Sequence, residues 1–292
     1  MHSRAIAEKP LTVIRATSMG MCFGVEDALE TVRSLEDPEA VTIHGELVHN
    51  DEVLREMKER GFRMVVESRR NVLPSTPTVV VTAHGVSDRE RSRLAAAGKT
   101  IVDTTCPLVR VVHRAAQRMQ SENRFVVVVG REGHVEVSGL VEDLNHYVIV
   151  NSKKDVRNWG EPSIGVVSQS TTSPAKLSAI RQAIEEKNSD ADIKFVDTIC
   201  DPTRQRQQAV DTMLAQVEAV VVVGGHNSNN TRQLVRRAEQ CGIPALHVQT
   251  SDDLDREWFT PFACVGLTAG TSTPSSTVEE VHARLLALRP AS

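Results

Sequence analysis

The sequence predicts an α/β protein made of three similar domains with mainly parallel sheets. Three observations lead to this prediction. Runs of valine and isoleucine alternate with segments of helical periodicity, which is typical of parallel strands that are buried on both faces. A cysteine follows three of these runs, at positions 22, 106 and 200. Similar strand-and-loop segments then recur at nearly constant distances behind each cysteine.

Each of these cysteines stands where a strand-like run gives way to a helix-like pattern. The strand-like runs begin at Leu11, Thr100 and Ile193. The patterns that follow place apolar residues at Val25/Ala28/Leu29/Val32, Leu108/Val111/Val112/Ala115 and Val210/Met213/Leu214/Val217. A thiol at the start of a helix feels the positive end of the helix dipole and loses its proton more easily.

Two further strand-and-loop segments complete each repeat. In the second segment the loops reach His49, His134 and His226, which lie 27, 28 and 26 residues behind the respective cysteines. In the third segment they reach His84, Ser170 and Ser272, at distances of 62, 64 and 72 residues. The repeat predicts three domains, 14–102, 103–196 and 197–288. Ligands of open α/β sheets bind beyond the carboxyl ends of the strands, so three such ends facing one axis would form one central chamber.

The composition excludes several classes of function. The chain of 292 residues has a net charge of −4, which gives no electrostatic case for nucleic acid or an anionic membrane as a partner. Six Phe, two Trp and one Tyr are too few for a base-stacking platform. No apolar run approaches the ~18 residues that a membrane helix needs. Residues 1–10 lack the apolar core of a signal peptide.

The five cysteines are widely separated and odd in number, which favours reduced thiols and a cytoplasmic location over a disulfide framework. We interpret Cys264 as a small buried strand residue and Cys241 as a residue at a helix end. The other three would hold a soft metal. Structural zinc usually recruits cysteines in close pairs, yet a Cys₃His zinc site from separate loops stays open. An iron–sulfur cluster tolerates distant ligands, and three thiolates would leave one iron open as a Lewis acid.

Polar residues at the predicted strand ends are the candidate ligands of an anion. They are His49, His84, His134, Ser228, Asn230 and Ser272. None of them belongs to a phosphate loop of the G-x-x-x-x-G-K-[ST] type. Six donors at roughly 1.5 kcal/mol each would contribute about 9 kcal/mol, and a diphosphate has enough acceptor oxygens to use them.

One carboxylate in these loops, Glu136, is the candidate proton donor. A side chain that faces a dry cavity has a raised pKa and can hold a proton near neutral pH. Glu46 and Asp103 are the competing carboxylates. We interpret Glu46 as a residue that precedes the loop, and Asp103 as a structural cap near the cysteine turn.

Nine motifs occur in an order that is typical of one known family. They are Gly20-Met-Cys22-Phe-Gly-Val, Val48-His49-Asn50, Ala83-His84-Gly-Val-Ser87, Asp103-Thr-Thr-Cys106-Pro-Leu-Val, Gly133-His134-Val-Glu136-Val, Ser168-Gln-Ser-Thr-Thr, Asp197-Thr-Ile-Cys200, Asn227-Ser228-Asn-Asn230 and Thr268-Ala-Gly-Thr-Ser272-Thr-Pro. On these residues the chain resembles the 4-hydroxy-3-methylbut-2-enyl diphosphate reductase family, which acts last in the non-mevalonate isoprenoid pathway. The resemblance extends from about Ile14 to about Leu288.

The resemblance implies a pseudo-threefold trefoil of α/β domains around a [4Fe–4S] cluster held by Cys22, Cys106 and Cys200. The iron without a protein thiolate would bind the allylic hydroxyl of the substrate, and its easy loss would leave a [3Fe–4S] form. Two electrons, from a ferredoxin or flavodoxin, and two protons would remove that hydroxyl as water. The products would be isopentenyl and dimethylallyl diphosphate.

The resemblance also assigns roles to individual residues. The diphosphate would be held by His49, His84, His134, Ser228, Asn230 and Ser272, with Asn229 beside them. Glu136 would deliver protons, and Ser170 and Thr171 would lie near the hydroxyl.

Four residues depart from the family pattern. Ser170 replaces a threonine, Asn229 replaces a serine, Phe23 replaces a smaller residue next to Cys22, and Val135 stands where a proline is usual. The alternatives are a three-cysteine cluster enzyme similar to quinolinate synthase, and a cluster-bearing redox sensor or paralogue without turnover.

Overall fold

The computed structural model describes residues 10–288, so the expectation of no signal peptide falls mainly outside the described residues. The chain divides into two compact units. The middle unit is Phe23–Arg204, and the terminal unit joins the N-terminal segment up to Cys22 with the segment from Gln205 onward. Each unit is built from parallel β-sheets with helices packed on them.

The described residues form three sheets of four strands, and every strand pair in them is parallel. The middle unit holds two sheets, with the strand orders β3(Arg63–Val65)-β2(Val41–His44)-β4(Thr78–Val81)-β5(Thr100–Asp103) and β7(Tyr147–Val150)-β6(Phe125–Val129)-β8(Ser163–Ser168)-β9(Asp192–Phe195). The terminal unit holds the sheet β1(Thr12–Arg15)-β12(Cys264–Ala269)-β10(Ala219–Val223)-β11(Ala245–Val248). The predicted fold class of three parallel-sheet α/β domains is confirmed.

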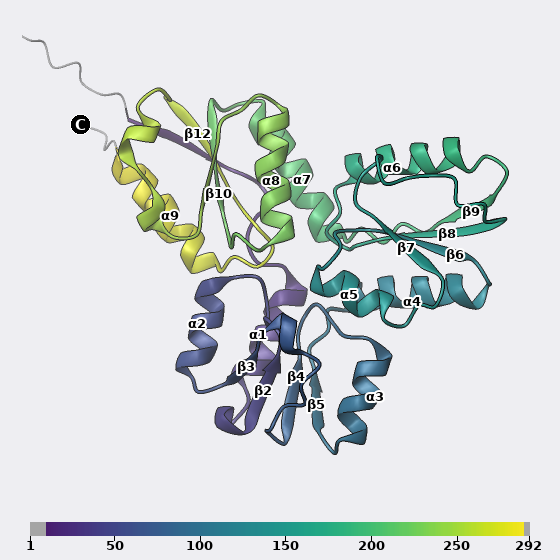
Figure 1. Cartoon of the computed structure of the whole chain (residues 1–292). Coiled ribbons are helices and arrows are strands. Elements are labelled where there is room, and N and C mark those ends of the chain that lie inside the picture. Colours follow the sequence, from purple (N-terminus) through teal and green to yellow (C-terminus); the bar gives the residue numbers. More distant parts are fainter. Residues whose placement is uncertain (1–9, 289–292) are drawn as a thin grey trace, which may run out of the picture. The chain divides into compact units, whose positions relative to one another are not determined.

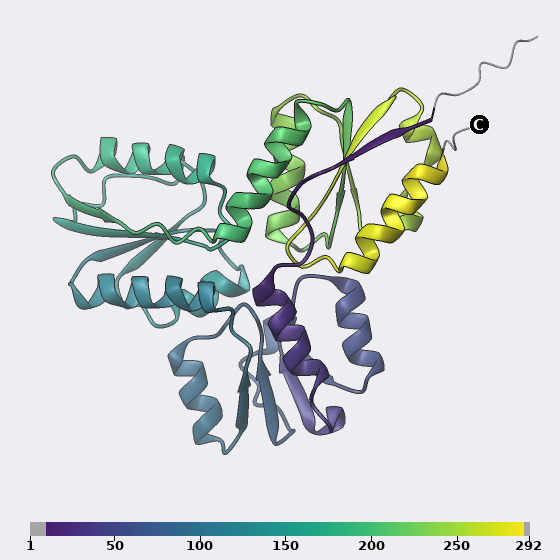
Figure 2. The same cartoon turned by 180° about the vertical axis from the view of Figure 1, so that it is seen from behind.

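The sheets share one connectivity. In each, the strand that precedes a predicted cysteine ligand is an edge strand: β1, β5 and β9 pair with β12, β4 and β8 respectively. Figure 2 shows β1 running along β12, although the two strands lie near opposite ends of the sequence. The predicted domain boundaries and the trefoil arrangement stay predictions.

Helices cover both faces of the sheets because the central strands are apolar on both sides. Every residue of β6 and β10 is buried. In the second sheet of the middle unit, α4(Pro107–Ser121) and α5(Val135–Val141) pack on one face and α6(Pro174–Lys187) packs on the other (Figure 1). In the terminal unit, α7(Asp201–Leu214) and α8(Asn229–Gln240) oppose α9(Ser275–Leu288). The first sheet is accompanied by α1(Phe23–Arg33), α2(Asp51–Glu59) and α3(Asp88–Ala96), and four short 3-10 turns lie at η1(Pro38–Ala40), η2(Glu67–Arg69), η3(Ser251–Asp253) and η4(Arg256–Phe259).

Two details of the predicted helix patterns are wrong. Val111 is 41% exposed, because the buried stripe of α4 runs through Val109 and Val112 instead. Val217 is buried but lies beyond the end of α7 at Leu214. An apolar residue just past a helix end matches the helical period without belonging to the helix.

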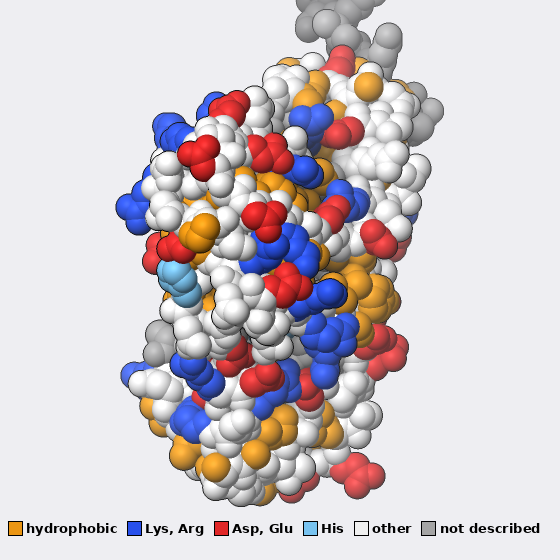
Figure 3. Space-filling model, turned by 90° about the vertical axis from the view of Figure 1, so that its right-hand side faces the viewer, with side chains coloured by type: hydrophobic (Ala, Val, Ile, Leu, Met, Phe, Trp, Pro, Cys, Tyr) orange, Lys and Arg blue, Asp and Glu red, His pale blue; other side chains and the backbone are white. Residues whose placement is uncertain are grey.

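The surface carries charges of both signs. On the face drawn in Figure 3, Lys and Arg side chains are interspersed with Asp and Glu side chains. Exposed ion pairs are common, as between Glu122 and Lys194, whose ammonium is the first cause that lowers the pKa of Glu122 to about 2. Within residues 10–288, no helix has the length and hydropathy required to cross a membrane.

Candidate active site

Each of the three predicted cysteine ligands immediately precedes a helix. Cys22 comes before α1, Cys106 is the N-cap residue of α4, and Cys200 comes before α7. All three cysteines are partly exposed. Each of these cysteines therefore lies at the N-terminal end of a helix, as the sequence predicts.

The backbone of these cysteines is anchored in the same way in each repeat. Each cysteine N–H donates to a carbonyl oxygen that lies two residues beyond the end of a central strand. The pairs are Cys22 with Thr271 at 3.1 Å, Cys106 with Ala83 at 3.1 Å, and Cys200 with Ser170 at 2.9 Å. In each of these loops, the residue that follows the accepting carbonyl group is polar. These residues are His84, Thr171 and Ser272, which therefore occupy matching positions in the three repeats.

The residues around these sulfur atoms fit an iron–sulfur cluster. A side chain at Gly24 would overlap the sulfur of Cys106, so a glycine keeps the space beside this thiol open. The sulfur of Cys200 lies 3.1 Å from the hydroxyl of Thr203. Among residues 10–288, no three His, Cys, Asp or Glu side chains form a ready site for a single metal ion. A cluster requires a wider arrangement, because its own iron and sulfide atoms separate the thiolates.

Three histidines from three different loops of the middle unit form a cluster of rings. His49 lies between β2 and α2, His84 lies between β4 and α3, and His134 is the N-cap residue of α5. The ring of His49 stacks on that of His84 with centroids 4.2 Å apart. His134 meets His49 edge-on at 5.1 Å and His84 at 5.9 Å. The structure therefore gathers these three candidate anion ligands, which we call the histidine cluster.

The proposed acid, Glu136, lies directly beside the histidine cluster. Its side chain is buried, with 2% of the residue exposed. Ser170 holds both carboxyl oxygens: its backbone N–H donates to Oε1 at 2.6 Å and its hydroxyl lies 2.9 Å from Oε2. Burial is the largest influence on the pKa of Glu136 and raises it, although the Ser170 hydrogen bonds and His49 act in the opposite direction.

Both carboxyl oxygens of Glu136 therefore accept hydrogen bonds from Ser170. The departure from threonine to serine at this position keeps the hydroxyl contact. The neighbouring Thr171 accepts a hydrogen bond from the side-chain amide of Gln169 at 3.2 Å.

The terminal unit holds the three neutral candidate residues, and all are buried. They are Ser228, Asn230 and Ser272. Ser228 is the N-cap residue of α8 and accepts the N–H of Thr231 at 3.2 Å, which leaves its own hydroxyl proton as a donor. Asn230 accepts the N–H of Thr271 at 3.1 Å, and its buried Nδ2 has no hydrogen-bond partner among the described residues. A buried amide donor without a partner is costly unless a ligand uses it. Asn229 is half-buried at the first position of α8.

The other residues singled out in the sequence take structural positions. Asp103 accepts from the N–H and hydroxyl of Thr105 and pairs with Arg91 and Arg110, as its interpretation as a cap requires. Cys264 begins β12 and Cys241 ends α8. Phe23 is 45% exposed at the start of α1.

One contact was missed at the sequence level. Glu46 was interpreted as a residue preceding the loop, yet its Oε2 lies 2.7 Å from Nδ1 of His49. A carboxylate three residues before a histidine was the available signal. This spacing alone does not reveal on which side of the loop each side chain lies, so it does not predict the contact.

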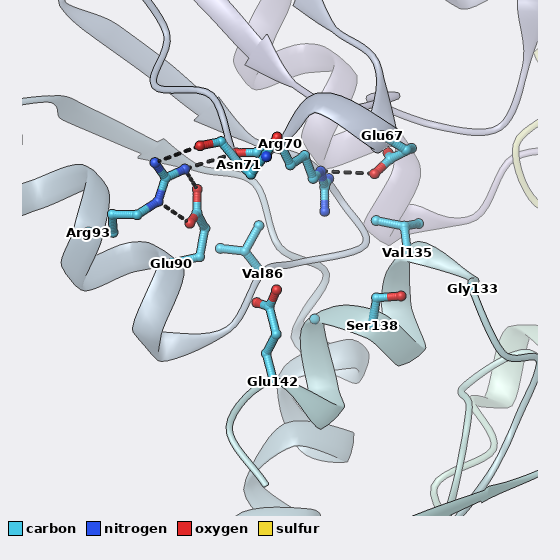
Figure 4. Close-up of a pocket in the computed structure, with 11 residues that line it drawn as sticks. Glu67, Arg70, Asn71, Val86, Glu90, Arg93, Gly133, Val135, Ser138 and Glu142 are labelled. Carbon is cyan, nitrogen blue, oxygen red and sulfur yellow. Dashed lines mark hydrogen bonds and ion pairs between the residues drawn. The ribbon is translucent and has the colours of Figure 1, made fainter.

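A cavity of about 640 Å³ lies beside the histidine cluster in the middle unit. Its charged lining residues are Glu67, Arg70, Glu90, Arg93 and Glu142. Figure 4 shows two ion pairs on its wall, one between Arg70 and Glu67 and one between Arg93 and Glu90, with the carboxylate of Glu142 pointing inward. Val135, next to His134, also lines the cavity.

Fold and site together define a protein of three parallel α/β sheets, with a cysteine before a helix in each repeat and buried polar loops at the strand ends. The sequence profile of the LytB protein family matches residues 13–286. The chain belongs to this family.

Named relatives match over nearly the whole chain. The 4-hydroxy-3-methylbut-2-enyl diphosphate reductase of Solidesulfovibrio magneticus is 33% identical, covering 93% of this chain and 98% of that protein. The enzyme of the same name from Methylibium petroleiphilum is 36% identical, covering 97% and 87%. These matches confirm the family resemblance recognised in the nine motifs.

Solved structures agree with the sequence relatives. The reductase from Plasmodium falciparum superimposes with a TM-score of 0.85 at 26% identity, covering 94% of this chain and 87% of the other. A second reductase structure, described as the terminal enzyme of the non-mevalonate pathway, has a TM-score of 0.66 at 28% identity, covering 94% and 99%.

Proposed function

We propose that this protein is a 4-hydroxy-3-methylbut-2-enyl diphosphate reductase, an oxidoreductase that converts this substrate to isopentenyl and dimethylallyl diphosphate. The observation that carries the proposal is a buried carboxyl group, Glu136, held by Ser170 beside the three rings of the histidine cluster. Full-length relatives with this activity support the same conclusion.

We propose that Cys22, Cys106 and Cys200 hold a [4Fe–4S] cluster, which supplies electrons and a Lewis-acidic iron when it is bound. The cluster receives its electrons from a ferredoxin or flavodoxin. The cysteines are odd in number and widely spaced along the sequence, which favours reduced thiols and supports a cytoplasmic location.

The chain's own residues bind the diphosphate and manage the protons. His49, His84 and His134 supply ring nitrogens to the anion. Ser228, Asn230 and Ser272 supply neutral donors to the same anion, with Asn229 beside them. The Nδ2 of Asn230 gains in such a complex the acceptor that it lacks in the described residues.

Removal of the hydroxyl consumes two electrons and two protons. The C–O bond breaks and a C–H bond forms, so one proton leaves in water and the other ends on carbon. Glu136 is the group that holds a proton at the site, and its Oε2 faces the Ser170 hydroxyl, from which the proton passes toward the substrate. Thr171 follows Ser170 in the loop and adds a second hydroxyl for the leaving group.

The test is an anaerobic assay of the reconstituted protein with reduced methyl viologen and the hydroxylated butenyl diphosphate. We expect consumption of two electrons per substrate and release of both five-carbon diphosphates. Dehydration without electron consumption would instead indicate a quinolinate-synthase-like reaction. An intact cluster without turnover would indicate a sensor or paralogue.

The matched variants are Cys106→Ser and Cys241→Ser. Cys106→Ser should lose the brown colour and the activity together, while Cys241→Ser, at the exposed end of α8, should keep both. Iron and sulfide content measures the cluster directly. Retention of colour and turnover in Cys106→Ser would refute the assignment of this ligand.

A further inference from the structure

The three rings of the histidine cluster differ in what they can donate. Nδ1 of His134 accepts the backbone N–H of Glu136 at 3.2 Å. A ring nitrogen that accepts a hydrogen bond carries no proton, so His134 is neutral with its proton on Nε2. Burial is the main cause that lowers the pKa of His84 well below 6.5, and His49 and His134 lower it further. Two of the three rings are therefore neutral.

His49 has a different partner. Its Nδ1 lies 2.7 Å from Oε2 of Glu46. An ionised carboxylate only accepts hydrogen bonds, so Nδ1 must donate. If the ring were neutral, Nε2 would then present a lone pair, which repels the oxygens of a diphosphate. A protonated ring donates from both nitrogens, to Glu46 on one side and to an anion on the other.

We propose that Glu46 is a positioning residue that keeps Nδ1 of His49 protonated and makes His49 the cationic ring of the cluster when an anion binds. Binding of a diphosphate is then coupled to uptake of a proton. This inference rests on the proposed function, because it takes the histidine cluster as the diphosphate site.

Glu46 is itself held in place by an ion pair of the cavity wall. Its backbone N–H donates to Oε1 of Glu67 at 2.9 Å, and Glu67 pairs with Nε of Arg70 at 2.9 Å. The preceding Gly45 has φ 112°, and a side chain there would overlap both members of that pair. Glycine is therefore required for the loop to approach Glu67 and Arg70 and to aim Glu46 at His49.

The charged and titratable neighbours of His49 come from several elements. They are Glu46 in its own loop, Glu67 at η2, His84 after β4, and His134 and Glu136 at the start of α5. His134 accepts a hydrogen bond at Nδ1, and burial lowers the pKa of His84 and raises the pKa of Glu136. Glu67 is engaged by Arg70, which leaves Glu46 as the carboxylate in hydrogen-bond contact with the His49 ring.

Two measurements on the anaerobic, cluster-loaded protein test this proposal. Nitrogen-15 NMR of histidine-labelled wild type reports which ring nitrogen of His49 carries a proton, without any ligand or turnover. Titration calorimetry with inorganic pyrophosphate, in two buffers of different ionisation enthalpy at pH 8, reports the affinity and the number of protons taken up. Both are compared between the wild type, Glu46→Gln and Asp51→Asn.

We expect a protonated Nδ1 and a net proton uptake in the wild type. Glu46→Gln removes the charge while keeping the shape, so pyrophosphate affinity should fall about tenfold and proton uptake should decrease. Asp51→Asn removes the same charge from an exposed residue of the first turn of α2 and should leave both values unchanged.

The outcomes distinguish the role of Glu46 from the existence of the anion site. A His49 without a proton on Nδ1, or a Glu46→Gln protein with wild-type affinity and proton uptake, would refute the role of Glu46. Absence of pyrophosphate binding in the wild type would refute the anion site and with it the coupling. A purely structural Glu46 would lower the melting temperature in Glu46→Gln without changing the proton uptake.

Discussion

The middle and terminal units place different chemistry at matching positions. His134 and Ser228 are both N-cap residues after a central strand, and Glu136 and Asn230 both occupy the second position of the helix that follows. In the middle unit both residues are of titratable types: His134 lowers the pKa of the neighbouring His84, and burial raises the pKa of Glu136. In the terminal unit a hydroxyl and an amide stay neutral at all working pH values. The repeat thus determines where polar groups lie, and the residue type decides whether binding or proton transfer depends on pH.

Of the matching residues Glu136 and Asn230, only Glu136 can ionise, and removing its carboxyl group should have the largest effect. Glu136→Gln keeps the size and the contacts to Ser170 but cannot release a proton, so turnover should fall at least ~100-fold with little change in KM. Steady-state kinetics under anaerobic conditions measure both constants. Glu132→Gln, an exposed residue of the same loop, is the matched control and should keep normal rates. Normal turnover in Glu136→Gln would assign proton delivery to another residue.

The central strands and the helix starts could be predicted from the sequence because they depend on local composition. Buried parallel strands such as β6 and β10 are runs of valine, and similar strand-and-loop segments recur at nearly constant distances behind each cysteine. The edge strands β3, β7 and β11 were missed, since short segments of mixed character pair only because a neighbouring strand is already in place.

The contacts between loops could not be predicted in the same way. The hydrogen bonds of Ser170 to Glu136 join residues that are 34 positions apart, and neither residue type requires the other. Glu46 and His49 are close in sequence, but their contact depends on the backbone at Gly45 and on Glu67. Such geometry follows from packing between elements rather than from any one segment.

A smaller effect should distinguish the neutral donors from the histidines. Asn230→Ala removes one neutral hydrogen-bond donor, so pyrophosphate affinity should fall about tenfold. The factor should be the same at pH 6.5 and pH 8.5. His49→Asn should weaken binding more at pH 6.5 than at pH 8.5, because the proposed uptake of a proton with the anion is less favourable at the higher pH. Calorimetry at the two pH values measures both variants.

The matched control for Asn230→Ala is Asn227→Ala, an exposed asparagine of the same loop, which should bind as the wild type does. A strong pH dependence of the Asn230→Ala effect would contradict the contrast between the units. It would mean that this amide acts through a titrating neighbour.

The smallest effect concerns stability. The folded protein holds the pKa of Glu136 above its ordinary 4.5. The contribution of the protonated carboxyl group to the free energy of unfolding is therefore fully present below pH 4.5 and is lost as the pH rises through the raised pKa. Glu136→Gln should therefore melt at a higher temperature than the wild type at pH 8. The difference should be about 2–4 °C for each kcal/mol by which the buried carboxyl group lowers the stability of the wild type at that pH. Near pH 4.5 the two should converge.

Differential scanning calorimetry of the anaerobic proteins at several pH values measures this difference. Asn230 occupies the matching position in the terminal unit but cannot ionise, so the change in melting temperature caused by Asn230→Ala should be the same at every pH. A Glu136→Gln protein that is less stable than the wild type at pH 8 would show that Glu136 is ionised there. The hydrogen bonds of Ser170 would then outweigh burial, and Glu136 would act as an acceptor, not as the acid of the reaction.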